Sequence, residues 1–377
     1  MVVRPLVERG AADDAEARAV EDSAVSHRRT LIALVVPVGI YLMLAGIRVV
    51  RNPPPDFDER IFLDVARHIV DTGLPIRTVA SPGPTLFFDH TPLLVYAVAV
   101  ATALGGPTQE LVRLLTLVTG VLTVLVVFRI GQEVRSVGSA FVAATLVAAN
   151  PFFARYGWYV RMEVPMCLFM VVGLYLLLHR RYLSSGLAIA VAVMLKEVAL
   201  AFWFVAGVYA MVREGWRSGL RVVVPSVIAF AAWVAYAMSI GSAQFLATMN
   251  RWLFSAQGAS IHDPRLHVGL GAWTLTVAVW VIGPVLLGAA GVAAAFVVAW
   301  KRPIPPIAFV PMAYVAIALA ASYVIKLKEP RFIIAVVPMM GIAIGLAVDW
   351  DDVFTALRER IRPQPGLSAS PGQSRGA

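Results

Sequence analysis

The first candidate for chemistry is a group of three carboxylates in the stretch Pro55–Glu59, directly after the first long apolar run. Asp58 stands where an amphipathic helix is expected to begin, and a helix N-terminus favours the ionised form of a carboxyl group. An ionised carboxylate can accept the proton of an acceptor hydroxyl as a general base. The alternative is a helix cap with solvated neighbours, which is the more common use of such residues. We take Asp58 and Glu59 as the candidate catalytic pair.

A second group, Arg155–Glu163, combines cations, aromatic rings and a carboxylate between two apolar runs. A guanidinium can hold a phosphate through two parallel hydrogen bonds, and aromatic rings can stack on sugar faces. Arg155, Tyr159, Arg161 and Glu163 are therefore candidates for binding the phosphate or the sugar of a substrate. An ordinary aromatic belt with snorkelling arginines explains the same residues equally well.

Two further charged groups interrupt or border apolar segments. Lys196 and Glu197 lie inside an apolar stretch, where an ionisable pair indicates a functional site by default; an internal ion pair is the alternative. Lys328 and Arg331 belong to a basic group just before the last apolar run. A bound lipid phosphate explains such cations, and so does contact with anionic headgroups in general.

Asp89 and His90 open a short apolar segment. They can cap a helix, position a substrate or join a metal site. One histidine beside a carboxylate is weak evidence for a metal, so we assign no metal ligands and favour the capping role.

The composition requires a membrane protein. The chain has 377 residues, 59% hydrophobic and 15% charged, whereas soluble domains have about a quarter charged residues. About 20 apolar residues span the bilayer core, and several runs reach that length. Most of the excess positive charge, +9 in total, borders these runs, where it orients helices. We therefore expect no nucleic-acid partner.

The apolar runs predict an all-α polytopic protein with about ten spans, within a range of nine to eleven. The expected spans are 30–49, 110–131, 137–154, 163–179, 183–195, 198–212, 220–241, 271–299, 306–325 and 331–349. Basic clusters follow every second span, which makes both termini cytoplasmic by the positive-inside rule. A membrane domain over 30–350 then lies between a disordered tail, 1–29, and a largely disordered cytoplasmic tail, 351–377.

The first outward loop, about 50–109, is long for a segment without structure. Apolar residues recur at helical spacing over 58–72, which predicts an amphipathic helix along the membrane surface that ends at Gly73. A second short helix is expected over 91–104, lying on or dipping into the outer face. Over 183–212 we favour two short helices with a recessed outward turn, since basic clusters flank both ends; a single helix remains the alternative.

This topology brings the charged groups together. The acidic stretch, the aromatic group, the lysine turn, the last basic group and Asp89–His90 all fall on the outward side. A cleft walled by these loops can hold an anionic lipid phosphate beside a carboxylate base.

The sequence resembles the polyprenyl-phosphate-dependent membrane glycosyltransferases of the type C fold, in particular the protein O-mannosyltransferase and aminoarabinose-transferase group. The resemblance covers about residues 30–350. The matching stretches are FDERIFLDVARHIVDTG, FDHTPLLVYAVAV, RLLTLVTGVLTVLVVFRIGQEV, ANPFFARYGWYVRMEVPMCLFMVVGLYLLL, LAIAVAVMLKEVAL and KEPRFIIAVVPMMGIAIG. Their fixed order makes them a stronger signal together than any one of them alone.

The resemblance implies roles for particular residues. Asp58 matches the catalytic carboxylate of the family's first outer loop, and Glu163 matches a second acidic position that is more often Asp. Lys196 matches a lysine that the family usually follows with Gly; because Glu197 stands there, we expect a salt bridge that limits Lys196. Arg331 matches an arginine before the last span. His90 matches a His-Pro-Pro pattern in which Thr91 replaces the first proline.

These observations predict an enzyme of the plasma membrane that transfers a sugar from a polyprenyl-phosphate donor to an acceptor hydroxyl on the outer face, with inversion and Asp58 as general base. The acceptor can be a lipid, a glycan or a protein. No cofactor is certain: the carboxylates can hold a divalent metal ion, whereas the resemblance implies a reaction without one. The alternatives are a transporter or flippase of a lipid-linked sugar, and a non-catalytic subunit of an envelope glycosylation complex.

Overall fold

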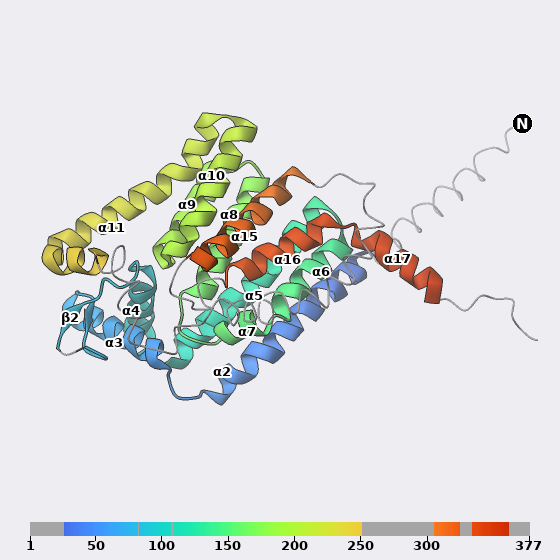
Figure 1. The fold of residues 1–377 in the computed structure, drawn as a ribbon. Coiled ribbons are helices and arrows are strands. Elements are labelled where there is room, and N and C mark those ends of the chain that lie inside the picture. The colour runs from blue at the N-terminus through green and yellow to red at the C-terminus, as the bar shows by residue number, and fades with distance from the viewer. Residues whose placement is uncertain (1–25, 82, 107–108, 251–304, 325–333, 362–377) are drawn as a thin grey trace, which may run out of the picture.

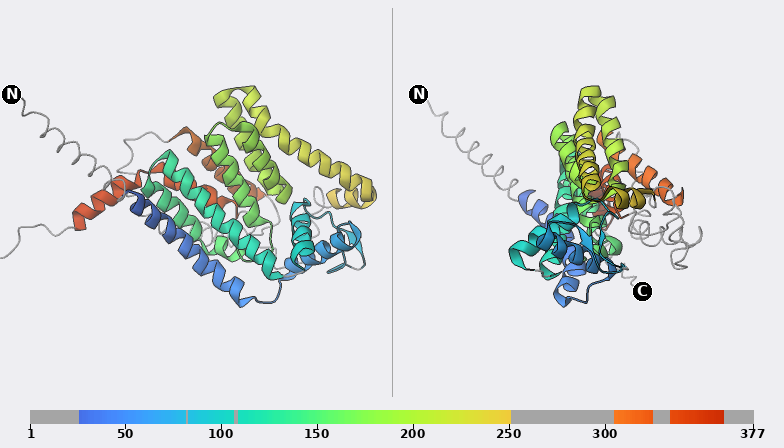
Figure 2. Two further views of the ribbon diagram at one scale, coloured as in Figure 1. Left: turned by 180° about the vertical axis from the view of Figure 1, so that it is seen from behind. Right: turned by 90° about the vertical axis from the view of Figure 1, so that its left-hand side faces the viewer.

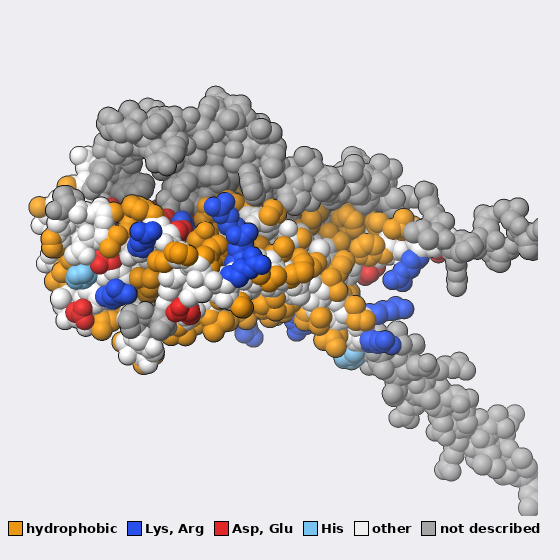
Figure 3. Space-filling view, turned by 90° about the horizontal axis from the view of Figure 1, so that it is seen from below, with side chains coloured by type: hydrophobic (Ala, Val, Ile, Leu, Met, Phe, Trp, Pro, Cys, Tyr) orange, Lys and Arg blue, Asp and Glu red, His pale blue; other side chains and the backbone are white. Residues whose placement is uncertain are grey.

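The computed structural model describes residues 26–81, 83–106, 109–250, 305–324 and 334–361. These residues form a helical bundle with one small hairpin of strands at its end (Figure 1). Hydrophobic side chains cover most of the visible surface of the bundle, with charged side chains of both signs near the hairpin end (Figure 3). The predicted helical class is therefore confirmed for the described part of the chain.

Three of the described helices are long and apolar enough to cross a membrane: Ser26–Arg51, α5 (Gln109–Val134) and α11 (Trp216–Asn250). Six shorter apolar helices accompany them. This supports a polytopic membrane protein, although the predicted number of about ten spans is not confirmed. The span predicted over 271–299 lies outside the described residues, as do the first residues of the span predicted over 331–349.

The first helix leads directly into the outer loop. It contains a π-helical turn, η1 (Leu42–Gly46), and closes with α2 (Ile47–Arg51). Asn52 ends it in the left-handed region, with φ 39°, a conformation that asparagine tolerates better than most residues. The chain can therefore turn sharply away from the helix axis towards the acidic stretch.

The predicted amphipathic helix is present as α3 (Phe57–Thr72). Asp56 caps it: its carboxylate accepts a hydrogen bond from the Glu59 amide at 2.9 Å, and the Glu59 carboxylate accepts one from the Asp56 amide at 3.0 Å. This reciprocal capping box satisfies two of the amide donors that a helix start leaves open. Gly73 ends the helix with φ 77°, which costs an L-residue more than glycine.

A two-stranded hairpin and a short helix complete the outer loop. Strands β1 (Ile76–Arg77) and β2 (Thr85–Leu86) pair antiparallel. Helix α4 (Leu93–Gly105) then packs against α3. At 13 residues α4 is shorter than a usual membrane span, in agreement with the short helix predicted there.

The remaining helices follow the predicted spans with two differences. They are α6 (Val137–Ala148), α7 (Pro151–Tyr156), α8 (Glu163–Leu178), α9 (Tyr182–Leu195), η2 (Glu197–Ala199), α10 (Leu200–Glu214), η7 (Pro306–Ala308), α15 (Phe309–Val324), α16 (Val336–Ala347) and α17 (Trp350–Ile361). The break between α9 and α10 confirms two helices over 183–212.

The first difference is that the span predicted over 137–154 is two helices. Asn150 stops the first and caps the second, because its side-chain oxygen accepts hydrogen bonds from the amides of Phe152 and Phe153 at 2.9 and 3.0 Å. Pro151 then occupies the first helical position, where no amide hydrogen is needed. Helix α7 stays packed in the core, since Phe152 and Phe153 are buried, and it leads into the aromatic group.

The second difference is α17, which makes the start of the predicted C-terminal tail helical. Phe354 packs edge-on against Phe141 of α6, with ring centroids 6.4 Å apart. Asp351 and Asp352 lie in the first turn, where negative charge favours a helix. The sequence analysis assigns 351–377 to a largely disordered tail, whereas the structure has a helix up to Ile361.

Small residues allow the central helices to approach closely. A Cβ at Gly131 of α5 would lie 2.6 Å from the Ala140 Cα of α6, and a Cβ at Gly345 of α16 would lie 2.8 Å from the Ser139 carbonyl oxygen. Backbones this close gain dispersion contacts that drive helix association within a bilayer. The helices α5, α6 and α16 therefore pack closely against one another.

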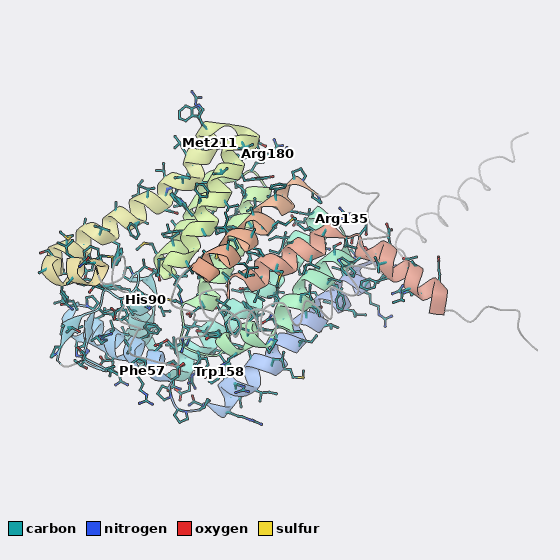
Figure 4. All side chains as sticks on the ribbon, in the orientation of Figure 1. Phe57, His90, Arg135, Trp158, Arg180 and Met211 are labelled. Atoms are coloured by element: carbon teal, nitrogen blue, oxygen red, sulfur yellow. The ribbon has the colours of Figure 1, made fainter. Side chains whose placement is uncertain are left out.

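The loops divide between the two ends of the bundle. Phe57, His90 and Trp158 lie towards one end, and Arg135, Arg180 and Met211 lie at the other (Figure 4). The left view in Figure 2 also places α17 at the end away from α3, α4 and the hairpin. Arg135 and Arg180, two of the basic residues beside the predicted spans, are therefore at the opposite end of the bundle from the start of α3.

Candidate active site

Asp58 lies at the start of α3 in an ion-pair cluster with Asp56 and Arg161. Arg161 Nη1 donates to Asp58 Oδ2 at 2.7 Å, and Nη2 donates to Asp56 Oδ2 at 2.5 Å. The side chains are 18% exposed for Asp58 and 12% for Arg161. Burial lowers the pKa of Arg161, but the charges of Asp58, Glu163 and Asp56 outweigh it and raise that pKa. The guanidinium therefore stays charged, and Asp58 remains within reach of solvent.

Glu59, the other half of the predicted pair, is fully buried. Its carboxylate accepts hydrogen bonds from Arg113 Nε at 2.9 Å and Nη2 at 2.7 Å, and from the Val160 amide at 2.8 Å. Both side chains of the Glu59–Arg113 pair are 0% exposed. Arg113 also donates to the Pro53 carbonyl oxygen at 2.8 Å. This network fastens the start of α3 to α5 and to the aromatic group, so its geometry favours a structural role for Glu59.

The aromatic group lines the same region. Arg161 lies over the rings of Tyr156 and Tyr159, with its Cζ 5.3 and 5.4 Å from their centroids. Trp158 stacks on Tyr159 at 3.8 Å between centroids and lies 5.2 Å from Arg113 Cζ. The guanidinium groups of Arg113 and Arg161 both contact these rings. The aromatic residues therefore help to position the two arginines that pair with the carboxylates of the acidic stretch.

Glu163 and Lys196 form a second buried pair at the same end. Lys196 Nζ donates to Glu163 Oε1 at 2.5 Å, between the start of α8 and the end of α9. We expected a salt bridge between Lys196 and its neighbour Glu197; the ion pair that the structure shows is with Glu163, and the charge of Lys196 also acts on Glu197. Lys196 has an extended backbone at the end of α9, with φ −158° and ψ 132°, and successive side chains of an extended segment point to opposite sides.

Glu197 turns instead towards His90. His90 Nδ1 lies 3.7 Å from Glu197 Oε1. Burial raises the pKa of Glu197, but the hydrogen bond and charge of His90, with the charge of Lys196, lower it to about 2. The His90 ring packs near Phe62 of α3 and Phe87, at 6.5 and 6.3 Å between centroids. His90 thus connects α3 to the turn before α10.

The other predicted residues lie in different settings. Asp89 accepts a hydrogen bond from Arg77 Nη1 at 2.7 Å, which fastens the hairpin to the start of α4. Arg155 is exposed on the last turn of α7. Lys328 and Arg331 lie outside the described residues, so their place relative to Asp58 stays a prediction. Among the described residues, the charged groups of the first loop, 155–163 and 196–197 come together as predicted.

Arg113 is the residue that the sequence analysis missed. It lies in the first turns of α5, inside the span predicted over 110–131. A charged residue within an apolar span is rare and marks a functional or structural pair. The sequence therefore contained a signal for Arg113, namely a charge inside an apolar span. The structure shows that its partner is Glu59.

No metal centre can be assigned from the described residues, because they contain no group of three or more His, Cys, Asp or Glu able to hold a metal ion. Asp56 and Asp58, the nearest pair of carboxylates, are bridged by the Arg161 guanidinium. The cation between these two carboxylates is therefore the side chain of Arg161.

An apolar groove of about 870 Å³ lies between α4, α9 and α11. Pro92 and Leu93, which directly follow the His90 turn, line one part of it, and Leu183 and Leu220 line another. The groove follows α9 between α4 and α11. The hydroxyl groups of Tyr96 and Tyr236 hydrogen-bond at 2.6 Å and tie α4 to α11. Such a groove accommodates a long hydrocarbon chain.

Comparisons with known proteins show which family and fold this chain resembles. Residues 89–240 match the family described as dolichyl-phosphate-mannose-protein mannosyltransferases. The fold is similar to that of ArnT from Cupriavidus metallidurans bound to undecaprenyl phosphate, with a TM-score of 0.58 and 18% identity over 88% of this chain. The resemblance inferred from the sequence is confirmed. No curated protein matches the chain in a direct sequence comparison.

Two further solved structures share the type C fold. The apo form of ArnT has a TM-score of 0.62 at 17% identity, with 86% of this chain covered. AglB, the archaeal oligosaccharyltransferase from Archaeoglobus fulgidus in complex with an inhibitory peptide and a dolichol-phosphate, has a TM-score of 0.52 at 16% identity, with 90% covered. The chain spans 63% and 60% of the two ArnT chains and 52% of the AglB chain.

Proposed function

We propose that this chain is a plasma-membrane glycosyltransferase that transfers a sugar from a polyprenyl-phosphate donor to an acceptor hydroxyl on the outer face. The observation that carries the proposal is the partly exposed Asp58 carboxylate, held by Arg161 at the start of α3. The match to the mannosyltransferase family and the type C fold support the same class of reaction. The acceptor is a lipid, a glycan or a protein.

In this mechanism Asp58 accepts the proton of the acceptor hydroxyl. The acceptor oxygen then attacks the anomeric carbon, the bond from that carbon to the phosphate oxygen breaks, and the polyprenyl phosphate leaves with the bonding electrons. One displacement inverts the anomeric configuration. General-base assistance of this kind contributes about 10²–10⁴-fold to a rate.

The leaving phosphate needs positive charge near the reacting carbon. Arg161 is one source, because its guanidinium already lies beside Asp58. Lys196 contributes a field rather than a direct contact, since it is buried against Glu163. Arg331, which the resemblance implies, and Lys328, from the same basic group of the sequence, are the further candidates for phosphate binding. Arg155 and Tyr159 remain candidates for the sugar or the acceptor.

The apolar groove between α4, α9 and α11 is proposed to hold the prenyl chain. From Leu183 to Met194 it follows α9 for roughly 16 Å, about half the bilayer core. Its beginning at Pro92 lies two residues from His90. A donor with its chain in the groove would therefore present its phosphate near the charged cluster.

The proposed orientation places both termini in the cytoplasm and the acidic stretch outside. Its support is the separation of Arg135 and Arg180 from the acidic end of the bundle (Figure 4), together with the tendency of basic residues to stay cytoplasmic.

The test uses the purified full chain in vesicles loaded with a panel of polyprenyl-phosphate sugars and acceptor hydroxyls. Release of free polyprenyl phosphate with formation of a glycosylated acceptor supports the proposal. Movement of intact donor across the bilayer, with no release, supports a flippase and contradicts it. The panel includes the lipid-linked sugar that accumulates in cells lacking the protein. If that donor is neither cleaved nor moved across the bilayer, the result supports a non-catalytic subunit.

A further inference from the structure

Two adjoining pockets lie at the end of the bundle opposite Asp58. The first, about 310 Å³, lies between α8, α10 and η7 and contains Arg180, Arg213 and Glu214. The second, about 510 Å³, is an apolar groove between α10 and α15. Both are lined by Tyr209, Arg213 and Pro306. The two volumes therefore meet at a polar boundary next to Arg213.

The first pocket carries a net positive charge. Two arginines face one carboxylate, and Arg180 Nη2 lies 3.6 Å from Glu214 Oε1, so this pair satisfies one positive charge. The Arg180 side chain is 75% exposed, and Arg213 is exposed as well. An incoming anion can therefore contact both guanidinium groups without separating a buried pair.

The backbone presents Arg180 in an unusual way. The Arg181 amide donates to the Leu176 carbonyl at 2.9 Å and the Arg180 amide to the Leu177 carbonyl at 3.0 Å, which is the Schellman ending of α8. Arg180 takes the left-handed position of that motif, with φ 58°, where glycine is usual. The helix ending therefore fixes the backbone of Arg180, whose side chain lines the first pocket.

The second pocket has the composition of a site for a hydrocarbon chain. Phe204, Val208 and Val212 repeat every four residues along α10, and Phe309, Ala313 and Ile317 do the same along α15. Residues four apart lie on one face of a helix, so the two rows face each other across the groove. Five of these six side chains add apolar surface, and Ala313 leaves room between them.

We propose that these pockets together bind one anionic phospholipid, with its phosphate between Arg180 and Arg213 and one acyl chain between α10 and α15. A phosphate beside two guanidinium groups and a chain along two apolar helix rows match the order of groups in such a lipid. The lipid links α10 to α15 and is separate from the donor groove, which lies along α9 and α11.

The headgroup half of the proposal is tested by native mass spectrometry of the full chain with dioleoylphosphatidylglycerol and dioleoylphosphatidylcholine in competition. We expect a preference of about tenfold for phosphatidylglycerol in the wild type. The double variant Arg180→Gln/Arg213→Gln should reduce it to within about twofold. The control Arg129→Gln/Arg217→Gln removes the same charge from residues outside both pockets and should keep the preference. Equal loss in both variants, or loss in neither, overturns the proposal.

The chain half is tested by filling the groove. Phosphatidylglycerol should raise the midpoint of thermal unfolding of the wild type, and Ala313→Trp should abolish this rise. Val227→Trp, at an exposed position of α11 outside both pockets, should retain it. If Ala313→Trp binds phosphatidylglycerol as the wild type does, the acyl chain lies elsewhere and the proposal is wrong.

Discussion

Asp58 and Glu59 are adjacent in sequence but face different environments. Glu59 accepts three hydrogen bonds from Arg113 and the Val160 amide in a fully buried network. Asp58 shares Arg161 with Asp56 in a cluster that solvent can still reach. The comparison shows two different settings within one acidic pair: the buried carboxylate holds the start of α3 in place, and the partly exposed carboxylate of Asp58 is the one that the proposed function uses.

The same division holds between the two arginines. Arg113 is 0% exposed, so its buried charge needs the Glu59 carboxylate as its counterion. Arg161 lies on the open side, where its two hydrogen bonds to Asp58 and Asp56 can be exchanged for contacts with an anionic substrate. We therefore expect changes in the Asp58–Arg161 cluster to lower turnover, and changes in the Glu59–Arg113 pair to lower the free energy of unfolding.

The largest expected effect is on turnover. Asp58→Asn should lower sugar transfer by about 10²–10⁴-fold because the general base is lost, while donor binding persists. The amide oxygen can still accept from Arg161, so the thermal unfolding midpoint should change little. The control is Asp71→Asn, an exposed residue in the last turn of the same helix. Wild-type turnover in Asp58→Asn removes Asp58 from the mechanism.

Next in size is the stability effect of Glu59→Gln. It leaves the Arg113 charge buried without its counterion, and breaking such a pair costs about 3–5 kcal/mol of unfolding free energy. The double variant Glu59→Met/Arg113→Met should recover most of this loss, because two apolar side chains need no counterion. Equilibrium unfolding in mixed micelles measures both. A single variant as stable as wild type would show that the pair is not structural.

A smaller effect is expected from Asp56→Ala, since Asp56 belongs to both clusters. It caps α3 through the Glu59 amide and holds one side of Arg161. Loss of the cap costs about 1–2 kcal/mol, and turnover should fall by less than in Asp58→Asn. Asp56→Asn should restore stability, since Asn is an equally good cap. A fall in turnover as deep as that of Asp58→Asn would make Asp56 the base instead.

The smallest effect concerns pH. The folded-state pKa of Glu197, about 2, lies below the ordinary value of 4.5, so the unfolded chain binds more protons. Its contribution to stability is complete above pH 4.5 and is lost as the pH falls towards 2. Glu197→Gln should therefore lose less stability over this interval than wild type, whereas Glu359→Gln, exposed on α17, should not differ. An unchanged slope in Glu197→Gln would contradict the His90–Glu197 pairing.

Local sequence predicted what depends on neighbouring residues. The cap at Asp56, the apolar spacing of α3 and the stop at Gly73 act within a few positions of one another, and the helix appears where they indicate. The break between α9 and α10 followed from flanking basic residues and from Lys196–Glu197. These features need no partner from elsewhere in the chain.

Pairings between distant segments could not be predicted in the same way. Glu59 meets Arg113 across 54 positions and Lys196 meets Glu163 across 33, so each choice depends on how whole helices pack. The neighbouring Lys196 and Glu197 were expected to form an ion pair, but the closest charged partner of Lys196 in the structure is Glu163, and Glu197 lies beside His90. The sequence therefore supplied the charged residues of the candidate site, and the packing decided their partners.

The most direct test of the proposed chemistry is the anomeric configuration of the product. The wild-type protein is given a polyprenyl-phosphate sugar of known configuration, and the glycosylated acceptor is characterised by NMR. A single displacement with Asp58 as base predicts an inverted product. A product with retained configuration would require two displacements through a covalent sugar–enzyme intermediate, and would contradict the account.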